Sequence, residues 1–259
     1  MMSGLCKVWV WLIRLDSTMS RILLEPGFIL HQRAFRDTSM ILDCFTRGYG
    51  RKSLIAKGIR ARTRRTSWKT VVQPFRSLLL SWSEKSQSDS QLGLMTAAED
   101  RPPRIQLPPA LLQCGVYMNE LLLYFTTQND EQPLLFALYE ETLAALTHVN
   151  QAAQADYLHE FILRRFEYGL LQELGYGLQL TIEQPHAYYY YDIERGLQPL
   201  ITARSLNHQP VLSAQTVTAL QAETFDQADR MELKRLMRYI IDYHLQGRPL
   251  RSRELFRSL

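Results

Sequence analysis

Acidic residues are missing from one long stretch of this 259-residue sequence. Between Cys44 and Trp82 there is no Asp or Glu, although the same stretch holds ten of the 30 Lys and Arg residues. The other 20 basic residues stand against all 26 acidic ones, so the rest of the chain is acidic even though the net charge is +4. Positive charge concentrated in one segment favours a polyanionic partner, while a merely solvated loop is the alternative.

Cysteines and long apolar runs are also scarce. Cys6, Cys44 and Cys114 are far apart, without a C-x-x-C pair or a Cys/His cluster, which argues against a zinc site and for unpaired thiols in a reducing compartment. The apolar start is interrupted by Lys7 and Arg14 and has no cleavage motif, so we interpret residues 1–26 as an extension from a mis-assigned start rather than a signal peptide. No run approaches the roughly 20 apolar residues that span a bilayer, and we expect a cytoplasmic protein without membrane contact.

Motifs for catalysis are absent. The six histidines are scattered, and neither a G-x-x-x-x-G-K-[ST] phosphate loop nor a G-x-S-x-G elbow occurs. No acidic cluster has the spacing that would hold a divalent metal for a nuclease. The sequence therefore predicts a protein that is not an enzyme, with no catalytic residues, no metal and no cofactor.

The first third of the chain has the pattern of short strands. Gly-containing or polar turns separate five apolar runs, which lie at residues 27–35, 40–46, 51–59, 74–84 and 90–99. Five short strands in about seventy residues predict a small closed barrel, and the OB-fold is the common five-stranded solution. We expect this domain to span residues 27–100.

A helical domain is expected at residues 101–259, after the prolines at 102–103 and 108–109. Apolar residues recur at helical spacing in five segments, which lie at 110–128, 132–149, 154–177, 213–223 and 229–247. Strand-forming residues interrupt them, so we expect a small β insertion near 178–205, with Tyr189 and Tyr191 on one face and Tyr188 and Tyr190 on the other. The predicted fold class is α+β, a five-stranded OB barrel followed by an all-α domain with a β insertion.

The basic segment lies between the third and fourth predicted strands, where loops of an OB-fold flank its nucleic-acid face. Cations neutralise phosphates and aromatic rings stack on bases, which together suit binding of single strands. The candidate phosphate contacts are Arg51, Lys52, Lys57, Arg60, Arg62, Arg64, Arg65 and Lys69, and the candidate stacking groups are Tyr49 and Trp68. An RNA-binding or ribosome-associated protein, or a protein-binding scaffold, remains an alternative.

A second basic cluster lies near the C-terminus. Its members are Lys234, Arg235, Arg238, Arg248, Arg251 and Arg253. Cations at a helix end interact favourably with the helix dipole, which is one explanation for the cluster. A pocket for an acidic, hydrophobic peptide is the functional alternative.

Several stretches together resemble the bacterial recombination mediator family RecO over about residues 27–257: "GFILHQRAFRDTSMILDCFTRGYGRKSLIAKGIR", "QPFRSLLLSW", "YMNELLLYF", "RRFEYGLLQELGYG" and "GRPLRSRELF". The resemblance implies an OB-fold, a helical domain and no catalytic turnover. It implies binding of single- and double-stranded DNA, annealing of strands coated with single-strand DNA-binding protein (SSB), and assistance to RecA loading together with RecR. It also implies a cytoplasmic, nucleoid-associated protein.

The resemblance bears on two sites. Many members carry four cysteines after the "LGYG" helix, but this chain has "LQLTIEQPHAYYYY" there and so resembles the branch without zinc. Members also bind the acidic C-terminal tail of SSB in the helical domain, which requires an apolar groove beside cations. Candidates for that site are Tyr117, Leu121, Arg164 and Arg165.

Overall fold

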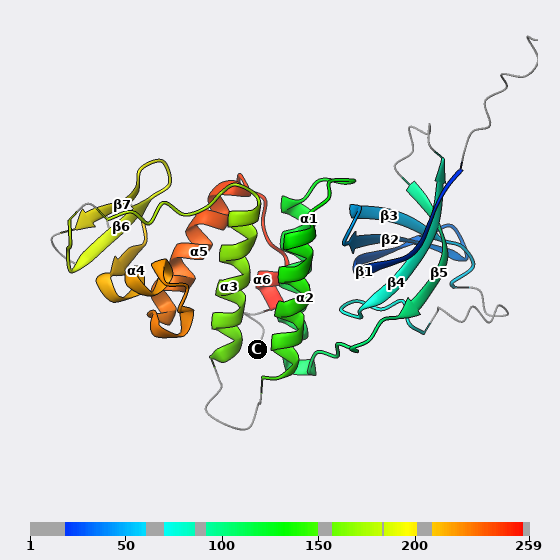
Figure 1. The fold of residues 1–259 in the computed structure, drawn as a ribbon, viewed down its shortest axis with the longest axis horizontal. Coiled ribbons are helices and arrows are strands. Elements are labelled where there is room, and N and C mark those ends of the chain that lie inside the picture. The colour runs from blue at the N-terminus through cyan, green and yellow to red at the C-terminus, as the bar shows by residue number, and fades with distance from the viewer. Residues whose placement is uncertain are drawn as a thin grey trace, which may run out of the picture.

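The N-terminal part of the molecule is a closed five-stranded barrel (Figure 1). The computed structural model describes residues 19–60, 70–85, 92–149, 157–182, 184–200 and 209–255. The strands are β1 (Met19–Phe35), β2 (Ser39–Thr46), β3 (Gly50–Ala56), β4 (Leu78–Lys85) and β5 (Leu92–Asp100). They close in the order β1-β2-β3-β5-β4, with only β3 and β5 parallel. The predicted OB-like barrel is confirmed, and alternate side chains such as Leu42, Leu54 and Trp82 fill its interior.

Strand β1 begins earlier than the sequence pattern indicates. Its first residues pair with β4, with Ile22 opposite Trp82, so residues 19–26 belong to the barrel and not to an extension. The register shifts after Ile22, and Leu24 adopts a φ of 52° before Pro26. This irregularity breaks the alternation of apolar and polar residues, which is the signal for a strand in sequence. Residues 1–18 lie outside the described part of the chain.

The helical domain follows in the predicted order. Its helices are α1 (Leu112–Phe125), α2 (Pro133–Thr147), α3 (Leu158–Glu173), α4 (Ala214–Gln221), α5 (Arg230–His244) and the short α6 (Ser252–Leu255). Single 3₁₀ turns lie at Pro109–Leu111 and Phe225–Gln227. Asp229 caps α5 by accepting hydrogen bonds from the backbone N–H groups of Met231 and Glu232, as an N-cap aspartate does. The β insertion consists of β6 (Tyr188–Asp192), β7 (Gly196–Leu200) and β8 (Val211–Ser213) in the order β7-β6-β8.

The small sheet lies at the end of the molecule away from the barrel (Figure 1). Tyr189 and Tyr191 are buried, and Tyr188 on the other face of β6 is 36% exposed. The predicted division of the four tyrosines between two faces is therefore confirmed. Strand β8 was not predicted, because three residues are too few to give a period of two.

Helices α1 and α2 lie against the barrel and share a hydrophobic core with it (Figure 1). The Phe136 ring lies 5.5 Å from the Phe28 ring and 5.7 Å from the Phe45 ring, measured between centroids. Asn119 donates a 2.9 Å hydrogen bond to the Leu30 carbonyl and accepts one of 2.5 Å from the Tyr139 hydroxyl. These buried contacts fix the position of the barrel relative to the helices.

At Gly50 the backbones of the two domains come close to each other. Gly50 has a φ of +60°, and a Cβ atom placed on it would lie 1.7 Å from the Asp130 carbonyl oxygen. Only glycine leaves space for this contact and adopts this conformation without strain. The turn between β2 and β3 therefore lies directly against the loop that follows α1.

Candidate functional site

The exposed cations of the basic segment lie just after β3. Lys57 and Arg60 are both exposed, and the Arg60 backbone N–H donates a 3.0 Å hydrogen bond to the Thr38 carbonyl. This bond ties the start of the basic connection to the turn between β1 and β2. The other candidates of this connection, Arg62, Arg64, Arg65, Trp68 and Lys69, lie outside the described residues. Lys57 and Arg60 thus present positive charge at the point where the chain enters that connection.

Arg51 and Lys52 do not face solvent as free cations. The Arg51 guanidinium donates a 2.8 Å hydrogen bond to the Thr126 carbonyl, and its partial burial lowers its pKa, opposed by nearby Asp43. The Lys52 residue is 7% exposed, and its ammonium lies 2.9 Å from the Glu84 carboxylate and 2.7 Å from the Asn129 side-chain oxygen. Both of these predicted phosphate contacts are therefore engaged in the domain junction in this structure.

Tyr49 keeps part of its ring accessible. Its residue is 36% exposed, and its ring lies against the buried Trp82 ring at 5.3 Å in an edge-on arrangement. Tyr49 therefore lies at the surface of the barrel, with Trp82 at its ring and the Lys52 ammonium 6.0 Å from its ring centroid. A base could stack there, since every base offers a π-face.

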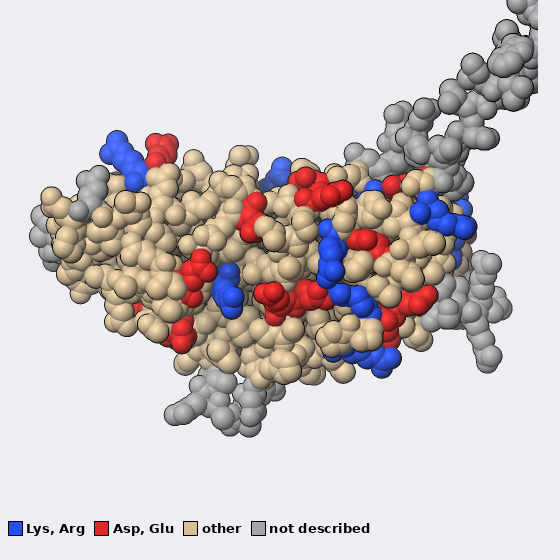
Figure 2. Space-filling model, viewed as in Figure 1, with Lys and Arg blue, Asp and Glu red and all other residues tan. Residues whose placement is uncertain are grey.

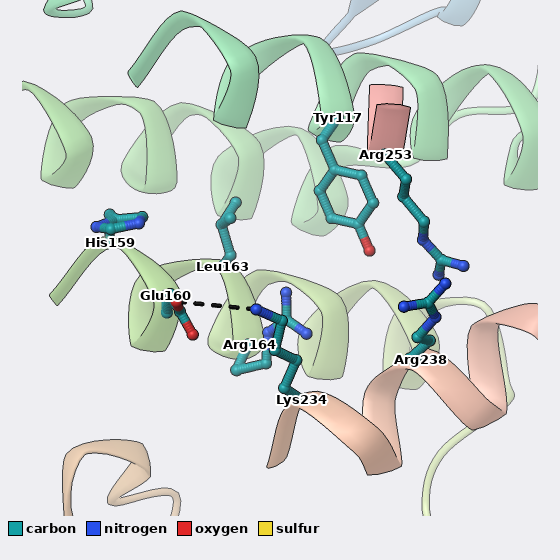
Figure 3. Close-up of a pocket in the computed structure, with 8 residues that line it drawn as sticks. All are labelled: Tyr117, His159, Glu160, Leu163, Arg164, Lys234, Arg238 and Arg253. Carbon is teal, nitrogen blue, oxygen red and sulfur yellow. Dashed lines mark ion pairs between the residues drawn. The ribbon is translucent and has the colours of Figure 1, made fainter. Parts of the chain in front are cut away.

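The helical domain contains a pocket of about 240 Å³ lined by cations (Figure 3). Its lining residues are Tyr117, His159, Glu160, Leu163, Arg164, Lys234, Arg238 and Arg253. They come from α1, α3, α5 and α6, which are far apart in the sequence. Four positive side chains around an apolar wall fit an anionic group that carries an apolar neighbour.

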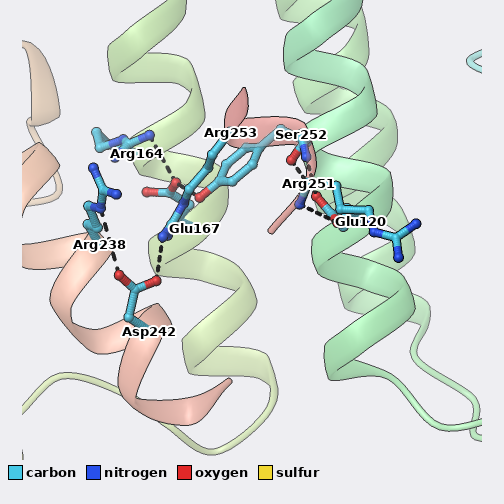
Figure 4. A network of polar contacts seen from close by, with 9 residues as sticks. Glu120, Arg164, Glu167, Arg238, Asp242, Arg251, Ser252 and Arg253 are labelled. Carbon is cyan, nitrogen blue, oxygen red and sulfur yellow. Dashed lines mark hydrogen bonds and ion pairs between the residues drawn. The ribbon is translucent and has the colours of Figure 1, made fainter. Parts of the chain in front are cut away.

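Carboxylates partly balance these cations. The Glu160 carboxylate lies 3.9 Å from the Lys234 ammonium. It also lies 3.1 Å from the guanidinium of Arg230, a residue that does not line the pocket. Asp242 lies 3.7 Å from Arg238 and forms a short contact with Arg253 (Figure 4). The pocket is therefore positive, and Lys234, Arg238 and Arg253 each lie near a carboxylate.

Glu120 fixes the helix that brings Arg253 to the pocket. Its carboxylate accepts hydrogen bonds of 2.9 Å from the backbone N–H groups of Arg251 and Ser252, and a short one from the Ser252 hydroxyl (Figure 4). A carboxylate at this position satisfies the free N–H groups at the start of α6. As a result, α6 is attached to α1 although they are separated by more than a hundred residues.

The structure brings two of the four candidates that the sequence analysis named for this second site into the pocket. Tyr117 and Arg164 line the pocket, but Leu121 is fully buried in the core and Arg165 is exposed outside the lining. Lys234, Arg238 and Arg253 were found in sequence only as a basic cluster, without a link to α3. Nothing in the sequence marked His159, Glu160 and Leu163 as site residues, because it is the packing of α3 against α1 and α5 that brings them to the pocket.

On the face shown in Figure 2, Lys and Arg are mixed with Asp and Glu, mainly over its middle and right-hand parts. Among the described residues there is no group of His, Cys, Asp and Glu side chains that could hold a metal ion. Within the same part of the chain, none of the helices has the length and apolar character needed to cross a bilayer.

Comparison with known proteins covers nearly the whole chain. Residues 19–100 match the family model "Recombination protein O N terminal", and residues 109–254 match "Recombination protein O C terminal". The chain is 40% identical to "DNA repair protein RecO" of Methylococcus capsulatus over 250 residues, which cover 92% of this chain and 95% of that protein. It is 37% identical to the protein of the same name from Polynucleobacter necessarius, over 92% of this chain and 97% of the relative.

Proposed function

This chain belongs to the RecO family of DNA repair proteins, and on that premise we propose that it binds DNA through the basic segment and SSB through the cationic pocket. The family consists of recombination mediators without catalytic turnover. Within that role, the proposed activities are binding of single- and double-stranded DNA, annealing of SSB-coated complementary strands, and assistance to RecA loading together with RecR.

The observation that carries the DNA proposal is the exposed positive charge where the basic segment leaves β3. The exposed Lys57 and Arg60 open a connection in which four further basic residues follow within the next nine positions. Such cations neutralise phosphates without reading bases, which suits a general repair factor. Annealing would follow if two strands were held with their charge neutralised and their bases free to pair.

The observation that supports SSB binding is the chemistry of the pocket. An acidic tail with apolar residues and a terminal carboxylate needs cations next to an apolar wall. Arg164, Lys234, Arg238 and Arg253 provide the cations, and Leu163 with the Tyr117 ring provides the wall. We therefore place the SSB tail in this pocket and not at Leu121 or Arg165.

Three further parts of the proposal depend on family membership. RecR is a proposed direct partner and RecA an indirect one. The protein would act in the cytoplasm at the nucleoid, and it would not require zinc, because the sequence has no cysteine after Cys114.

The test of DNA binding is fluorescence anisotropy of labelled single-stranded DNA over a salt series. If the segment neutralises about four to six phosphates, log K should fall with log salt at a slope of about −3 to −4. A variant with Arg60, Arg62, Arg64 and Arg65 changed to Ala should bind more weakly with a shallower slope. The matched control changes four exposed arginines of the helical domain, Arg165, Arg195, Arg235 and Arg248, and should keep the wild-type slope.

Other outcomes would favour the alternatives. Much tighter binding of RNA than of DNA with the same sequence would indicate an RNA-binding protein. Negligible binding of either nucleic acid at moderate salt would indicate a protein scaffold. An equal loss of affinity in the two fourfold variants would contradict the assignment of DNA binding to the basic segment.

A further inference from the structure

One carboxylate lies behind the pocket and not in it. Glu167 on α3 is fully buried, and one of its oxygens, Oε1, takes two contacts. The Arg164 guanidinium lies 2.9 Å from Oε1, and the Tyr117 hydroxyl donates a short hydrogen bond to the same atom (Figure 4 shows the ion pair). Both of these partners line the pocket. Two residues of the pocket wall are thus in direct contact with Glu167.

These contacts fix the two wall residues. Arg164 has a long side chain, and holding it in place before a ligand arrives removes an entropic cost from ligand binding. Its Nε atom is buried without a hydrogen-bond partner among the described residues, so the ion pair with Glu167 is the contact that orients the guanidinium. The Tyr117 hydroxyl joins α1 to the same carboxylate on α3.

Glu167 also sets the net charge of the pocket. Burial raises the pKa of Glu167, while Arg164 and the hydrogen bond from Tyr117 act in the opposite direction. The second oxygen, Oε2, is buried without a hydrogen-bond partner in the described part of the chain, and negative charge on such an oxygen is disfavoured. In the neutral form Glu167 no longer balances Arg164, and the pocket gains one positive charge.

We propose that Glu167 is a positioning residue that orients Arg164 and Tyr117 in the pocket and, through its charge state, makes the binding of anionic ligands dependent on pH. The inference rests on the proposed function of the pocket. When Glu167 is ionised it competes with the ligand's carboxylate for Arg164, so the ligand is bound more weakly. When Glu167 is neutral, it still accepts hydrogen bonds, but Arg164 attracts the ligand with its full charge.

Other titratable groups near Glu167 also contribute to the pH dependence of ligand binding. Those facing it or the pocket are Cys114 and Tyr117 on α1, His159, Glu160 and Arg164 on α3, Lys234, Arg238 and Asp242 on α5, and Arg253 on α6. Of these, His159 carries an imidazole, the type of side chain that changes its charge closest to neutral pH. Its contribution is measured with His159→Gln.

The experiment measures binding of a labelled peptide from the SSB C-terminal tail by anisotropy, from about pH 5.5 to about pH 9, where the peptide's own carboxylates remain ionised. We expect the wild-type affinity to fall by about tenfold across the range, the effect of one nearby charge. Glu167→Gln keeps an oxygen acceptor without a charge, so it should bind with the wild-type low-pH affinity throughout. Glu167→Leu removes the acceptor and should bind about three- to tenfold more weakly than Glu167→Gln.

The controls distinguish this inference from its premise. His159→Gln should keep the part of the pH dependence that is due to Glu167. If the wild type binds the peptide but Glu167→Gln retains the same pH profile, the inference is overturned while the pocket assignment stands. If the wild-type protein does not bind the peptide at any pH, both are overturned. Circular dichroism confirms folding, and should Glu167→Leu fail to fold, the profile of Glu167→Gln alone decides.

Discussion

The Lys52 ammonium donates a 2.7 Å hydrogen bond to the side-chain oxygen of Asn129, so a cation of the barrel holds the loop that follows α1. The same ammonium forms an ion pair with Glu84 at 2.9 Å. Lys52 is therefore a structural residue of the domain junction, although it lies in the segment whose charge suggests contact with DNA.

The first prediction contrasts Lys52 with Lys57. Lys52→Ala should lower the free energy of unfolding by about 1–3 kcal/mol, because Glu84 and Asn129 lose a charged partner in a largely buried site. Lys57→Ala, at an exposed position five residues later, should change it by less than about 0.5 kcal/mol. Urea denaturation measures both values. Similar losses in the two variants would contradict the assignment of Lys52 to the junction.

The second prediction concerns the aromatic contact between the domains. Phe136→Ala should lower the free energy of unfolding by about 3–5 kcal/mol, since the ring fills the space between Phe28 and Phe45. Leu134 on the same helix is 67% exposed, and Leu134→Ala is the matched control with a change of less than about 0.5 kcal/mol. Thermal and urea unfolding provide the measurement. A small effect at Phe136 would mean that the two domains do not depend on each other for stability.

The third prediction is a pH dependence of stability. Because the pKa of Glu167 is raised, the folded protein keeps this proton at pH values where the unfolded chain has released it. The contribution of Glu167 to stability should therefore be greatest at low pH and decrease as the pH rises from the ordinary glutamate range to the raised value. Each pKa unit between the two states corresponds to about 1.4 kcal/mol.

Urea denaturation over a pH series tests this third prediction. Glu167→Gln lacks the titration, so its stability relative to the wild type should increase with pH. Glu173→Gln, an exposed change on the same helix segment, should follow the wild-type curve. A constant difference between Glu167→Gln and the wild type at all pH values would contradict the assignment.

Much of the fold could be predicted because its signals are local. Gly-containing turns and apolar runs located the five strands of the barrel, and helical spacing located α1 to α5. The start of β1 was missed because Leu24 has a positive φ and the register shifts there. Alternation from one residue to the next does not survive such a bulge.

The two candidate sites differ in how far the sequence determines them. The basic segment is visible as charge, but the sequence does not distinguish Lys52 from Lys57. Only the contact of the barrel with the 126–130 loop does, because a cation that gains Glu84 and Asn129 as partners is no longer available to a phosphate. For the pocket, Arg164 and Arg165 are adjacent in sequence, but the packing of α3 separates their roles. Arg164 lines the pocket, whereas Arg165 is exposed to solvent outside it.

The sequence by itself determined the fold class, the separation of charge and the lack of catalytic motifs, since these depend on composition and on neighbours along the chain. Tertiary structure alone decided which cations are free and which side chains form the pocket. Arg164, Arg238 and Arg253 lie on three helices, and the packing of these helices brings them into one pocket with the buried Leu163 and Tyr117. Burial and pairing depend on neighbours in space, and these are not fixed by order along the chain.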